Sequence, residues 1–413
     1  MSERIQAPRG TFDVVGDDAL ARDRLAETAR GILEPAGYAR IETPMFESTA
    51  LFARGVGEST DIVQKEMYTF DAGDSESLTL RPEGTAPVCR AYLEHGMHKL
   101  PQPVKLWYLS SYFRRERPQK GRYRQFWQLG IEAIGSDDPA VDAEAILLLS
   151  EILEAIGARA LRLRISSLGS PEARAAYREE LIAYLRSREG ELSQEVRERI
   201  DLNPLRAFDA DHPPTKAAMA DAPLLLDALA PEDREHFDEV LALLDAAGVA
   251  YEVDPTLVRG LDYYTRTVFE YTSDALGAQS GVGGGGRYDG LMEQIGGARA
   301  PGMGWAAGVE RMLLASPPPP VAPPPVDLYV AYAKPEHRSA AFRLAADARR
   351  AGHAARLELG GRSLKGQLKQ ADRAGARYVA ILGDEGTALK DMESGEQQTV
   401  ATETVMHHIR SGL

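Results

Sequence analysis

YFRRERPQKGRYRQFWQLGIEAIG, residues Tyr112 to Gly135, is the stretch of the sequence that decides the fold. Its first two residues begin a strand, and a charged segment follows that contains two turn formers, Pro118 and Gly121. From Phe126 to Ile134 every second residue falls on one face of a returning strand. The stretch therefore predicts two antiparallel strands joined by a long charged loop.

The loop of this hairpin is strongly basic. Beside one acid, Glu116, it holds six basic residues: Arg114, Arg115, Arg117, Lys120, Arg122 and Arg124. Guanidinium groups match phosphate oxygens two at a time, so the loop suits a polyphosphate or a nucleic-acid backbone. Gln128 and Glu132 share a face of the returning strand and would form a floor for a polar ligand. The alternative is a solvated hairpin with a charged tip, because charge runs are usually solvated.

Composition restricts the class of protein. The chain has 413 residues, of which 27% are charged and 44% hydrophobic, enough for two or three domains with a large core. It has no apolar run of about 18 residues, and its N-terminus lacks the apolar stretch of a secretory signal. The single cysteine, Cys89, forbids an internal disulfide and a multi-cysteine zinc site. We therefore expect a cytoplasmic protein that does not span a membrane.

The net charge of −14 argues against a general nucleic-acid binder. Residues 326–413 carry 13 basic and 11 acidic side chains, a net of +2, so the rest of the chain carries −16. RNA would have to be steered by local basic patches on an acidic body. The loop 114–124 is the strongest such patch.

Apolar spacing and turn signals predict the remaining elements of the first 160 residues. Helices are expected at Asp18–Leu33, at Ala86–His95 and from Asp138-Pro139 to Gly157. Short strands are expected at Tyr38–Pro44, Asp61–Phe70 and Ser77–Leu80. This part of the chain is therefore expected to mix helices with a sheet.

The later part of the chain falls into three segments of different composition. From about residue 170 to 253, long charged helical segments predict a mostly helical insertion. Residues 316–325, SPPPPVAPPP, contain seven prolines in ten positions and predict a semi-rigid spacer of roughly 30 Å. Residues 326–413 alternate strands with helices, which predicts a small α/β domain. We therefore expect domains at 1–325 and 326–413.

Three further segments agree with the hairpin: LTLRPEGTAPVCRA (Leu78–Ala91), LVRGLDYYTRTVFEY (Leu257–Tyr271) and GMGWAAGVERMLL (Gly302–Leu314). Together the four segments resemble the histidyl branch of the class II aminoacyl-tRNA synthetases. The hairpin is similar to motif 2 of that class, and Gly302–Leu314 is similar to its motif 3. The resemblance implies an α/β fold with an α+β catalytic core, an antiparallel sheet flanked by helices. It also implies a helical insertion and a C-terminal α/β anticodon-binding domain.

The resemblance implies a histidine–tRNA ligase. Histidine carboxylate would attack the α-phosphorus of ATP, and the acyl group would then move to the terminal ribose of tRNA(His). The substrates would be L-histidine, ATP and tRNA(His), and Mg²⁺ would bridge the phosphates with few protein ligands of its own. The family also implies a homodimer. The chemistry requires two anions to be brought together and charge on the α-phosphate to be stabilised, which arginines can do.

The resemblance also assigns residues. Arg259 and Arg114 would be catalytic, with Arg114 holding both the α-phosphate and the histidine carboxylate. Histidine binding falls to Glu83, Gly84, Thr85, Arg114, Gln128, Glu132, Arg259, Tyr263 and Tyr264. ATP binding falls to Arg114, Glu116, Phe126 and Arg311. Within these sets Glu83 would take the substrate ammonium group, and Glu132 and Tyr264 the imidazole nitrogens.

Some features depart from the family pattern or fit it loosely. Trp127 and Trp305 stand where other aromatic residues are more usual, and we expect altered packing with retained activity. The run of four glycines from Gly283 is not a dinucleotide fingerprint, because the spacing is wrong. Glycine there would let the backbone approach substrate closely, and a mobile loop is the alternative.

Two other functions are alternatives to this one. One is a non-catalytic relative that regulates ATP phosphoribosyltransferase; such proteins typically lack the anticodon-binding domain and degrade the segment around Arg259, and both are intact here. The other is a class IIa synthetase for threonine or proline, which the LDYY segment and the lack of a zinc-binding Cys/His set disfavour.

Overall fold

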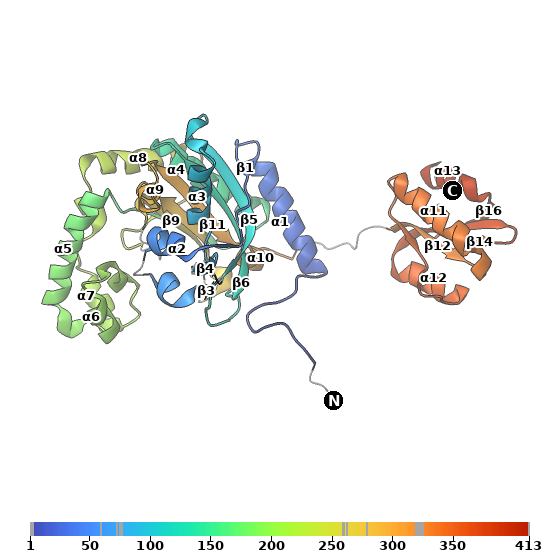
Figure 1. The fold of residues 1–413 in the computed structure, drawn as a ribbon, viewed down its shortest axis with the longest axis horizontal. Coiled ribbons are helices and arrows are strands. Elements are labelled where there is room, and N and C mark those ends of the chain that lie inside the picture. The colour runs from blue at the N-terminus through green and yellow to red at the C-terminus, as the bar shows by residue number, and fades with distance from the viewer. Residues whose placement is uncertain are drawn as a thin grey trace. The chain divides into compact units, whose positions relative to one another are not determined.

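The computed structural model describes residues 4–57, 60–71, 73, 77–257, 261, 263–277, 280–318 and 326–411 (Figure 1). The chain forms two compact units, Met1–Pro319 and Pro320–Leu413. Most of the expected polyproline spacer, residues 319–325, lies outside the described residues. None of the described helices is long and apolar enough to cross a membrane.

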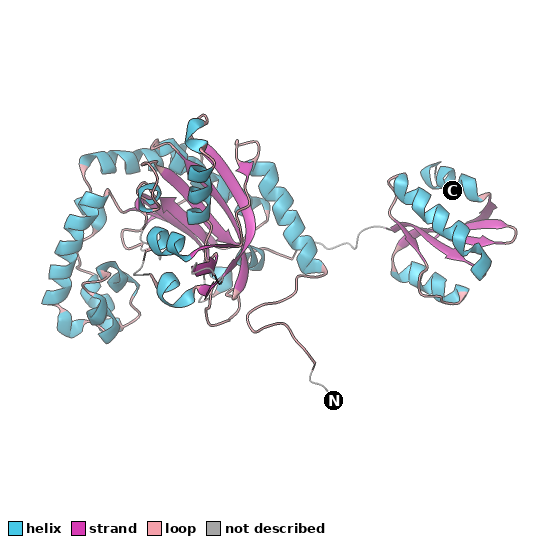
Figure 2. Ribbon diagram, viewed as in Figure 1, coloured by secondary structure: helices cyan, strands magenta, loops and turns pink. Residues whose placement is uncertain are grey.

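A sheet of eight strands forms the centre of the first unit (Figure 2). In spatial order its strands are β1 (Ala39–Arg40), β5 (Val104–Phe113), β6 (Gln125–Ile134), β11 (Gly302–Gly308), β10 (Gly281–Arg287), β9 (Thr265–Ser273), β7 (Leu161–Ser167) and β8 (Glu252–Val253). The two outermost pairs are parallel and all other neighbours are antiparallel. The predicted fold class is therefore confirmed.

The hairpin predicted at 112–135 is the pair β5–β6. The strands stay in register over their full ten residues, from Val104 opposite Ile134 to Phe113 opposite Gln125. The loop closes where the Arg114 N–H donates to the Arg124 carbonyl at 2.9 Å. The pairing puts the loop 114–124 at one end of strands β5 and β6.

Helices cover both faces of this sheet (Figure 1). One face packs against α1 (Asp17–Leu33), α4 (Pro139–Ala155), α8 (Pro231–Ala246) and α10 (Val309–Ala315), in a core that includes Trp107, Ile131 and Trp305. The other face packs against α3 (Thr85–Glu94) and α9 (Leu291–Gln294), in a core that includes Tyr108 and Tyr112. This second face carries the candidate site.

Helix α4 begins at the predicted residue for the predicted reason. The Asp138 carboxylate accepts from the Ala140 N–H at 2.9 Å, and Pro139 occupies the first turn. The helix also buries one charge, Asp142, which accepts from Arg287 at 2.5 Å and from His236 at 2.9 Å. This buried pair ties α4 to β10 and α8.

Residues 171–246 hold four helices: α5 (Pro171–Ser187), α6 (Gln194–Arg199), α7 (Pro213–Met219) and α8. The first three share a small core of their own, formed around Tyr177, Leu181, Ile200 and Met219. Helix α8 returns to the main core through Phe237. A three-stranded sheet lies beside α2 (Thr49–Val56), in the order β2 (Phe46–Ser48), β4 (Ser77–Leu80), β3 (Tyr68–Asp71).

One local prediction was wrong. The segment Asp61–Phe70 is a strand only from Tyr68, because Ile62–Glu66 forms a π-helical turn whose Ile62 packs into a small cluster with Phe52. The glycine-rich segment is strand β10, inside the main sheet, which excludes the alternative of a mobile loop.

The glycines of β10 are required by close approach. A Cβ on Gly285 would lie 1.9 Å from the Gly304 carbonyl oxygen, and one on Gly286 would lie 2.6 Å from the Thr267 carbonyl oxygen. No side chain fits at either position.

The second unit is a five-stranded sheet with helices on both faces. Its order is β13 (Ala355–Leu357), β12 (Val326–Tyr332), β14 (Ala376–Gly383), β15 (Gly386–Asp391) and β16 (Gln397–Val400). The first three strands are parallel and the last two antiparallel. Helices α11 (Arg338–Arg350) and α13 (Val405–Ser411) pack on one face and α12 (Leu364–Arg373) on the other. The sequence predicted the parallel part, and β15 and β16 were not foreseen.

Candidate active site

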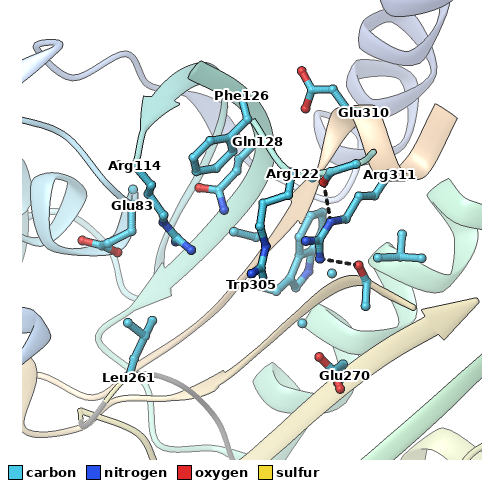
Figure 3. A pocket seen from close by; sticks show the side chains of 18 of the residues that line it. Glu83, Arg114, Arg122, Phe126, Gln128, Leu261, Glu270, Trp305, Glu310 and Arg311 are labelled. Atoms are coloured by element: carbon cyan, nitrogen blue, oxygen red, sulfur yellow. Dashed lines mark hydrogen bonds between the residues drawn. The ribbon is translucent and has the colours of Figure 1, made fainter. Parts of the chain in front are cut away.

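A cavity of about 220 Å³ lies over the central strands, at the end where the loop 114–124 folds back (Figure 3). Ten of the predicted residues line it: Glu83, Gly84, Thr85, Arg114, Glu116, Phe126, Gln128, Tyr263, Tyr264 and Arg311. They come from the turn before α3, the hairpin, the segment before β9 and the start of α10. Glu132 lies behind this lining, and Arg259 lies outside the described residues.

Three guanidinium groups occupy one part of the cavity wall. Arg114 donates to the Pro82 carbonyl at 3.0 Å, and Arg311 donates to the Gly121 and Gly281 carbonyls at 2.8 Å each (Figure 3). Burial lowers the pKa of Arg311 from its ordinary value, and the nearby charges of Arg122 and Arg114 act in the same direction. The carbonyls hold Arg311 without cancelling its charge, and although Arg122 and Arg114 lie 2.7 Å and 3.8 Å from Glu116, the guanidinium groups outnumber that carboxylate, so this wall favours an anion.

Three of the four carboxylates of the cavity wall, all but Glu83, have arginine partners. Glu116 is 2.7 Å from Arg122, and Glu310 is 2.6 Å from Arg22. Glu270 is 2.7 Å from Arg164, which stands on β7. These pairs lower the negative charge that an incoming polyphosphate would meet. They also leave few carboxylate oxygens for a metal ion.

Phe126 and Arg114 form a flat surface. The Arg114 guanidinium carbon lies 5.3 Å from the centroid of the Phe126 ring, a distance typical of a cation–π contact. Both side chains line the cavity, so a planar ligand could stack there. Beside them, the buried Gln128 side-chain carbonyl has no hydrogen-bond partner among the described residues. An unpaired buried acceptor is costly, which indicates that a ligand donor completes it.

Glu83 is a buried acceptor at the N-terminus of α3. Its carboxylate accepts from the Thr85 N–H at 2.7 Å and from the Ala86 N–H at 3.0 Å. Burial raises the pKa of Glu83, and these two hydrogen bonds oppose the rise. Gly84 is needed beside it, because a Cβ there would lie 2.6 Å from the Tyr108 ring. Glu83 therefore caps the first turn of the helix.

Glu132 lies one layer below the cavity. It is fully buried, and its two oxygens accept hydrogen bonds from Thr85 at 2.8 Å, Tyr108 at 3.2 Å and Tyr288 at 2.5 Å. Burial raises its pKa to about 8, against these three hydrogen bonds, and the charge of Glu83 adds to the rise. Thr85 lines the cavity, so its hydroxyl connects Glu132 to the ligand space.

Several lining residues were not singled out from the sequence: Tyr123, Leu261, Glu270, Val282, Ala306 and Glu310. Glu270 and Glu310 lay within quoted motifs, and the period-two pattern of β9 could have put Glu270 on the same face as Thr272. Arg22, which holds Glu310, is 288 residues away in sequence, and no local signal could have identified it.

Trp305 lies in the wall of the cavity and is buried. Its indole N–H donates to the Ala145 carbonyl of α4 at 2.7 Å, so the polar atom of the ring is paired. The backbone N–H of Trp127 donates to the Glu310 carboxylate at 3.2 Å. Both tryptophans are therefore accommodated by partners beneath the sheet surface.

Comparisons with known proteins agree along the whole chain. The family model described as histidyl-tRNA synthetase matches residues 10–312, and the model described as anticodon binding domain matches residues 327–411. The histidine–tRNA ligase of Streptomyces coelicolor is 46% identical over 99% of this chain and 98% of its own length. That of Nocardia farcinica is 48% identical over 98% of both. The crystal structure of apo Staphylococcus aureus histidyl-tRNA synthetase matches with a TM-score of 0.82 at 34% identity, covering 98% of this chain and 100% of that one.

Proposed function

The chain belongs to the histidyl-tRNA synthetase family, and we propose that the cavity of its first unit is where L-histidine reacts with ATP. The chain is a histidine–tRNA ligase, an aminoacyl-tRNA synthetase. In the first step the histidine carboxylate attacks the α-phosphorus, an oxygen–phosphorus bond forms, and pyrophosphate leaves. In the second, the ribose hydroxyl at the 3′ end of tRNA(His) takes the acyl group and AMP leaves.

Each arginine binds a different part of the ATP triphosphate or its reacting centre. Arg114 holds the α-phosphate and the histidine carboxylate together, which is the positioning that the first step needs. Arg311 takes the γ-phosphate, with its guanidinium fixed by two backbone carbonyls. Arg259, outside the described residues, is the second arginine at the α-phosphate. Charge that develops on the α-phosphate oxygens is stabilised by these fixed cations.

The adenine ring lies on Phe126, on the surface that it forms with Arg114. Glu116 accepts from the exocyclic amino group, and its pairing with Arg122 holds it at the cavity wall. Mg²⁺ bound with the nucleotide would neutralise phosphate charge. Glu116, Glu270 and Glu310 are each paired with an arginine, so these carboxylates do not form a cage of protein ligands for the metal ion.

Histidine occupies the part of the cavity near α3. Glu83 takes its ammonium group, and Gly84 and Thr85 shape the turn around it. Glu132 and Tyr264 take the imidazole nitrogens, with Gln128 and Tyr263 against the ring. What supports Glu132 in this role is its link to the cavity through Thr85, whose hydroxyl donates to it at 2.8 Å. Glu132 does not itself line the cavity and already accepts from Tyr108 and Tyr288, so an imidazole N–H would bind it in exchange for one of its present contacts.

The other parts of the chain act on tRNA. The second unit, an α/β anticodon-binding domain, reads the anticodon. Residues 326–413 form this domain and residues 1–325 the catalytic domain, in which the helical insertion at about 170–253 approaches the acceptor arm. Enzymes of translation work in the cytoplasm, and we place this chain there.

We propose a homodimer in which the small sheet contributes to the contact. Met45, Phe46 and Phe70 are 53%, 51% and 43% exposed, and the two phenyl rings lie 6.2 Å apart. An exposed apolar group of this kind marks an interaction surface. Sedimentation equilibrium should give twice the chain mass, and Phe46→Asp should shift it toward one chain mass. A monomeric wild-type protein would contradict the proposal.

The observation that carries the function is the convergence of three arginines and the buried Glu83 in one cavity. The test is histidine-dependent exchange of pyrophosphate into ATP without tRNA. Exchange with histidine alone among the amino acids is expected, and Arg311→Ala should weaken it while the surface variant Arg350→Ala, at a side chain 76% exposed, should not. Histidine binding without exchange would instead favour the regulatory subunit of ATP phosphoribosyltransferase.

A further inference from the structure

A short N-terminal segment runs along the loop of the hairpin. We call residues 8–15 the strap; they precede helix α1. The Gly10 carbonyl accepts from the Arg124 N–H at 2.8 Å and from the Gln125 N–H at 3.5 Å. The Arg9 carbonyl accepts from the Arg124 side chain at 3.5 Å. The strap therefore holds the point where the loop re-enters strand β6.

Side chains extend this contact to the cavity. The ring of Phe12 lies 4.7 Å from the ring of Tyr123, at an interplanar angle of 57°, and Tyr123 lines the cavity. The Arg22 guanidinium carbon lies 5.6 Å from the centroids of both Phe12 and Trp127. Arg22 also pairs with Glu310, the neighbour of Arg311 in sequence. The strap, α1, β6 and α10 therefore meet at the base of the loop.

Gly10 can be no other residue in this arrangement. Its φ is +90°, and a Cβ there would lie 2.8 Å from Arg124 Cγ and 2.9 Å from Pro118 Cγ. Gly16 offers the matched comparison, because its φ is +60° but nothing lies within 4 Å of a Cβ. Alanine would strain the backbone at both positions, but only at Gly10 would it also push on the loop.

The loop is fixed at several points besides the strap. Gln119 and Arg122 exchange backbone hydrogen bonds at 3.0 and 2.9 Å, and Arg311 holds the Gly121 carbonyl. The Arg115 N–H donates to the Glu66 carbonyl at 2.7 Å, and the Arg122 side chain lies 2.7 Å from Glu116. At the end of the returning arm, the Arg124 N–H donates to the Gly10 carbonyl at 2.8 Å. The strap is therefore the contact that fixes this end of the arm, next to Tyr123.

We propose that the strap is a positioning element of the ATP site, and that Gly10 and Phe12 hold the loop 114–124 in its ATP-binding conformation before nucleotide arrives. The kinetic consequence of this inference, a change in KM for ATP, rests on the proposed function. A loop that is already ordered loses less conformational freedom when ATP binds. Neither Gly10 nor Phe12 lines the cavity, so neither is expected to touch ATP.

The kinetic test compares Gly10→Ala and Phe12→Ala with the controls Gly16→Ala and Val15→Ala, the latter at a side chain 70% exposed. In the exchange assay, the first two should raise KM for ATP about ten-fold, since a displacement of about 1 Å is enough for such losses. KM for histidine should change less than about two-fold, because Glu83 and Thr85 are not touched by the strap. Phe12→Tyr should restore the ATP value. The midpoint of thermal unfolding of Gly10→Ala should equal that of Gly16→Ala.

A second readout does not need activity. Arg115 and Lys120 are exposed trypsin sites in the loop, and Arg117 is protected by the following proline. Gly10→Ala and Phe12→Ala should be cut there faster than wild type, and both controls at the wild-type rate. Unchanged cleavage and unchanged KM for ATP would overturn the inference. Equal rises in both KM values, or an unfolding midpoint below that of Gly16→Ala, would also overturn it, because the strap would then be merely structural. If wild type shows no exchange, the proposed function fails, and proteolysis alone decides whether the strap holds the loop.

Discussion

Replacing Glu132 with glutamine should change how the stability of the first unit depends on pH. Burial raises the pKa of Glu132 to about 8 from an ordinary 4.5. Between these values the folded chain holds a proton that the unfolded chain has released, so the free energy of unfolding falls as pH rises. One proton is worth about 1.4 kcal/mol per pH unit, so from pH 5 to pH 7.5 the wild type should lose about 3 kcal/mol through this group. Glutamine cannot titrate, so Glu132→Gln should not show this loss.

The assay uses the fluorescence of tryptophan during urea unfolding. Trp107, Trp127 and Trp305 all lie in the first unit, so the signal reports on that unit. The quantity to compare is the free energy of unfolding of wild type minus that of Glu132→Gln, at pH 5, 6 and 7.5. Other carboxyl groups with a raised pKa, such as Glu83, contribute to both proteins and cancel in this difference. The control Glu195→Gln, at a side chain 78% exposed, should keep the wild-type slope. A difference that is flat across this range, or that rises with pH, would refute the reasoning.

Three other predictions concern activity. Arg259→Ala should nearly abolish histidine-dependent pyrophosphate exchange while histidine binding, followed by calorimetry, is weakened but measurable; exchange near the wild-type rate would show that the second arginine does not act at the α-phosphate. Glu83→Gln should raise KM for histidine by about 10- to 150-fold, since a hydrogen bond to a charged group is worth about 1.5–3 kcal/mol; an unchanged KM would move the ammonium site elsewhere. Deleting residues 326–413 should leave exchange intact and impair tRNA charging; if both fall equally, the second unit supports the fold of the first.

Local patterns predicted the elements whose residues decide their own conformation. The hairpin was predictable because Pro118 and Gly121 mark its turn and the strand that follows alternates. Helix α4 was predictable because Asp138 and Pro139 form a capping pair in sequence. In both, the signal and the structure lie within a few residues of each other.

Tertiary contacts decided the rest. Strand β10 reads as a loop because glycine is a poor strand former, and only the backbones of β9 and β11, too close for any Cβ, explain it. Alternation put Glu132 on the same face as Gln128, but could not show that the strand carries it beneath Thr85. The pairing of Arg22 with Glu310 depends on a contact across 288 residues.

The charge balance of the cavity depends on residues from several motifs and from outside them. Its carboxylates Glu310 and Glu270 are held by arginines that come from outside the cavity lining, Arg22 and Arg164. Its own Arg311 is held by carbonyl oxygens, which fix a guanidinium without neutralising it, whereas Arg114 binds the Pro82 carbonyl and also lies 3.8 Å from Glu116. Because Glu310 and Glu270 are balanced from behind and Arg311 is not neutralised by its carbonyl partners, the cavity can attract a polyphosphate although the chain carries a net charge of −14. Affinity for ATP should therefore be sensitive to Arg22 and Arg164 as well, since losing either would free a carboxylate to repel the phosphates.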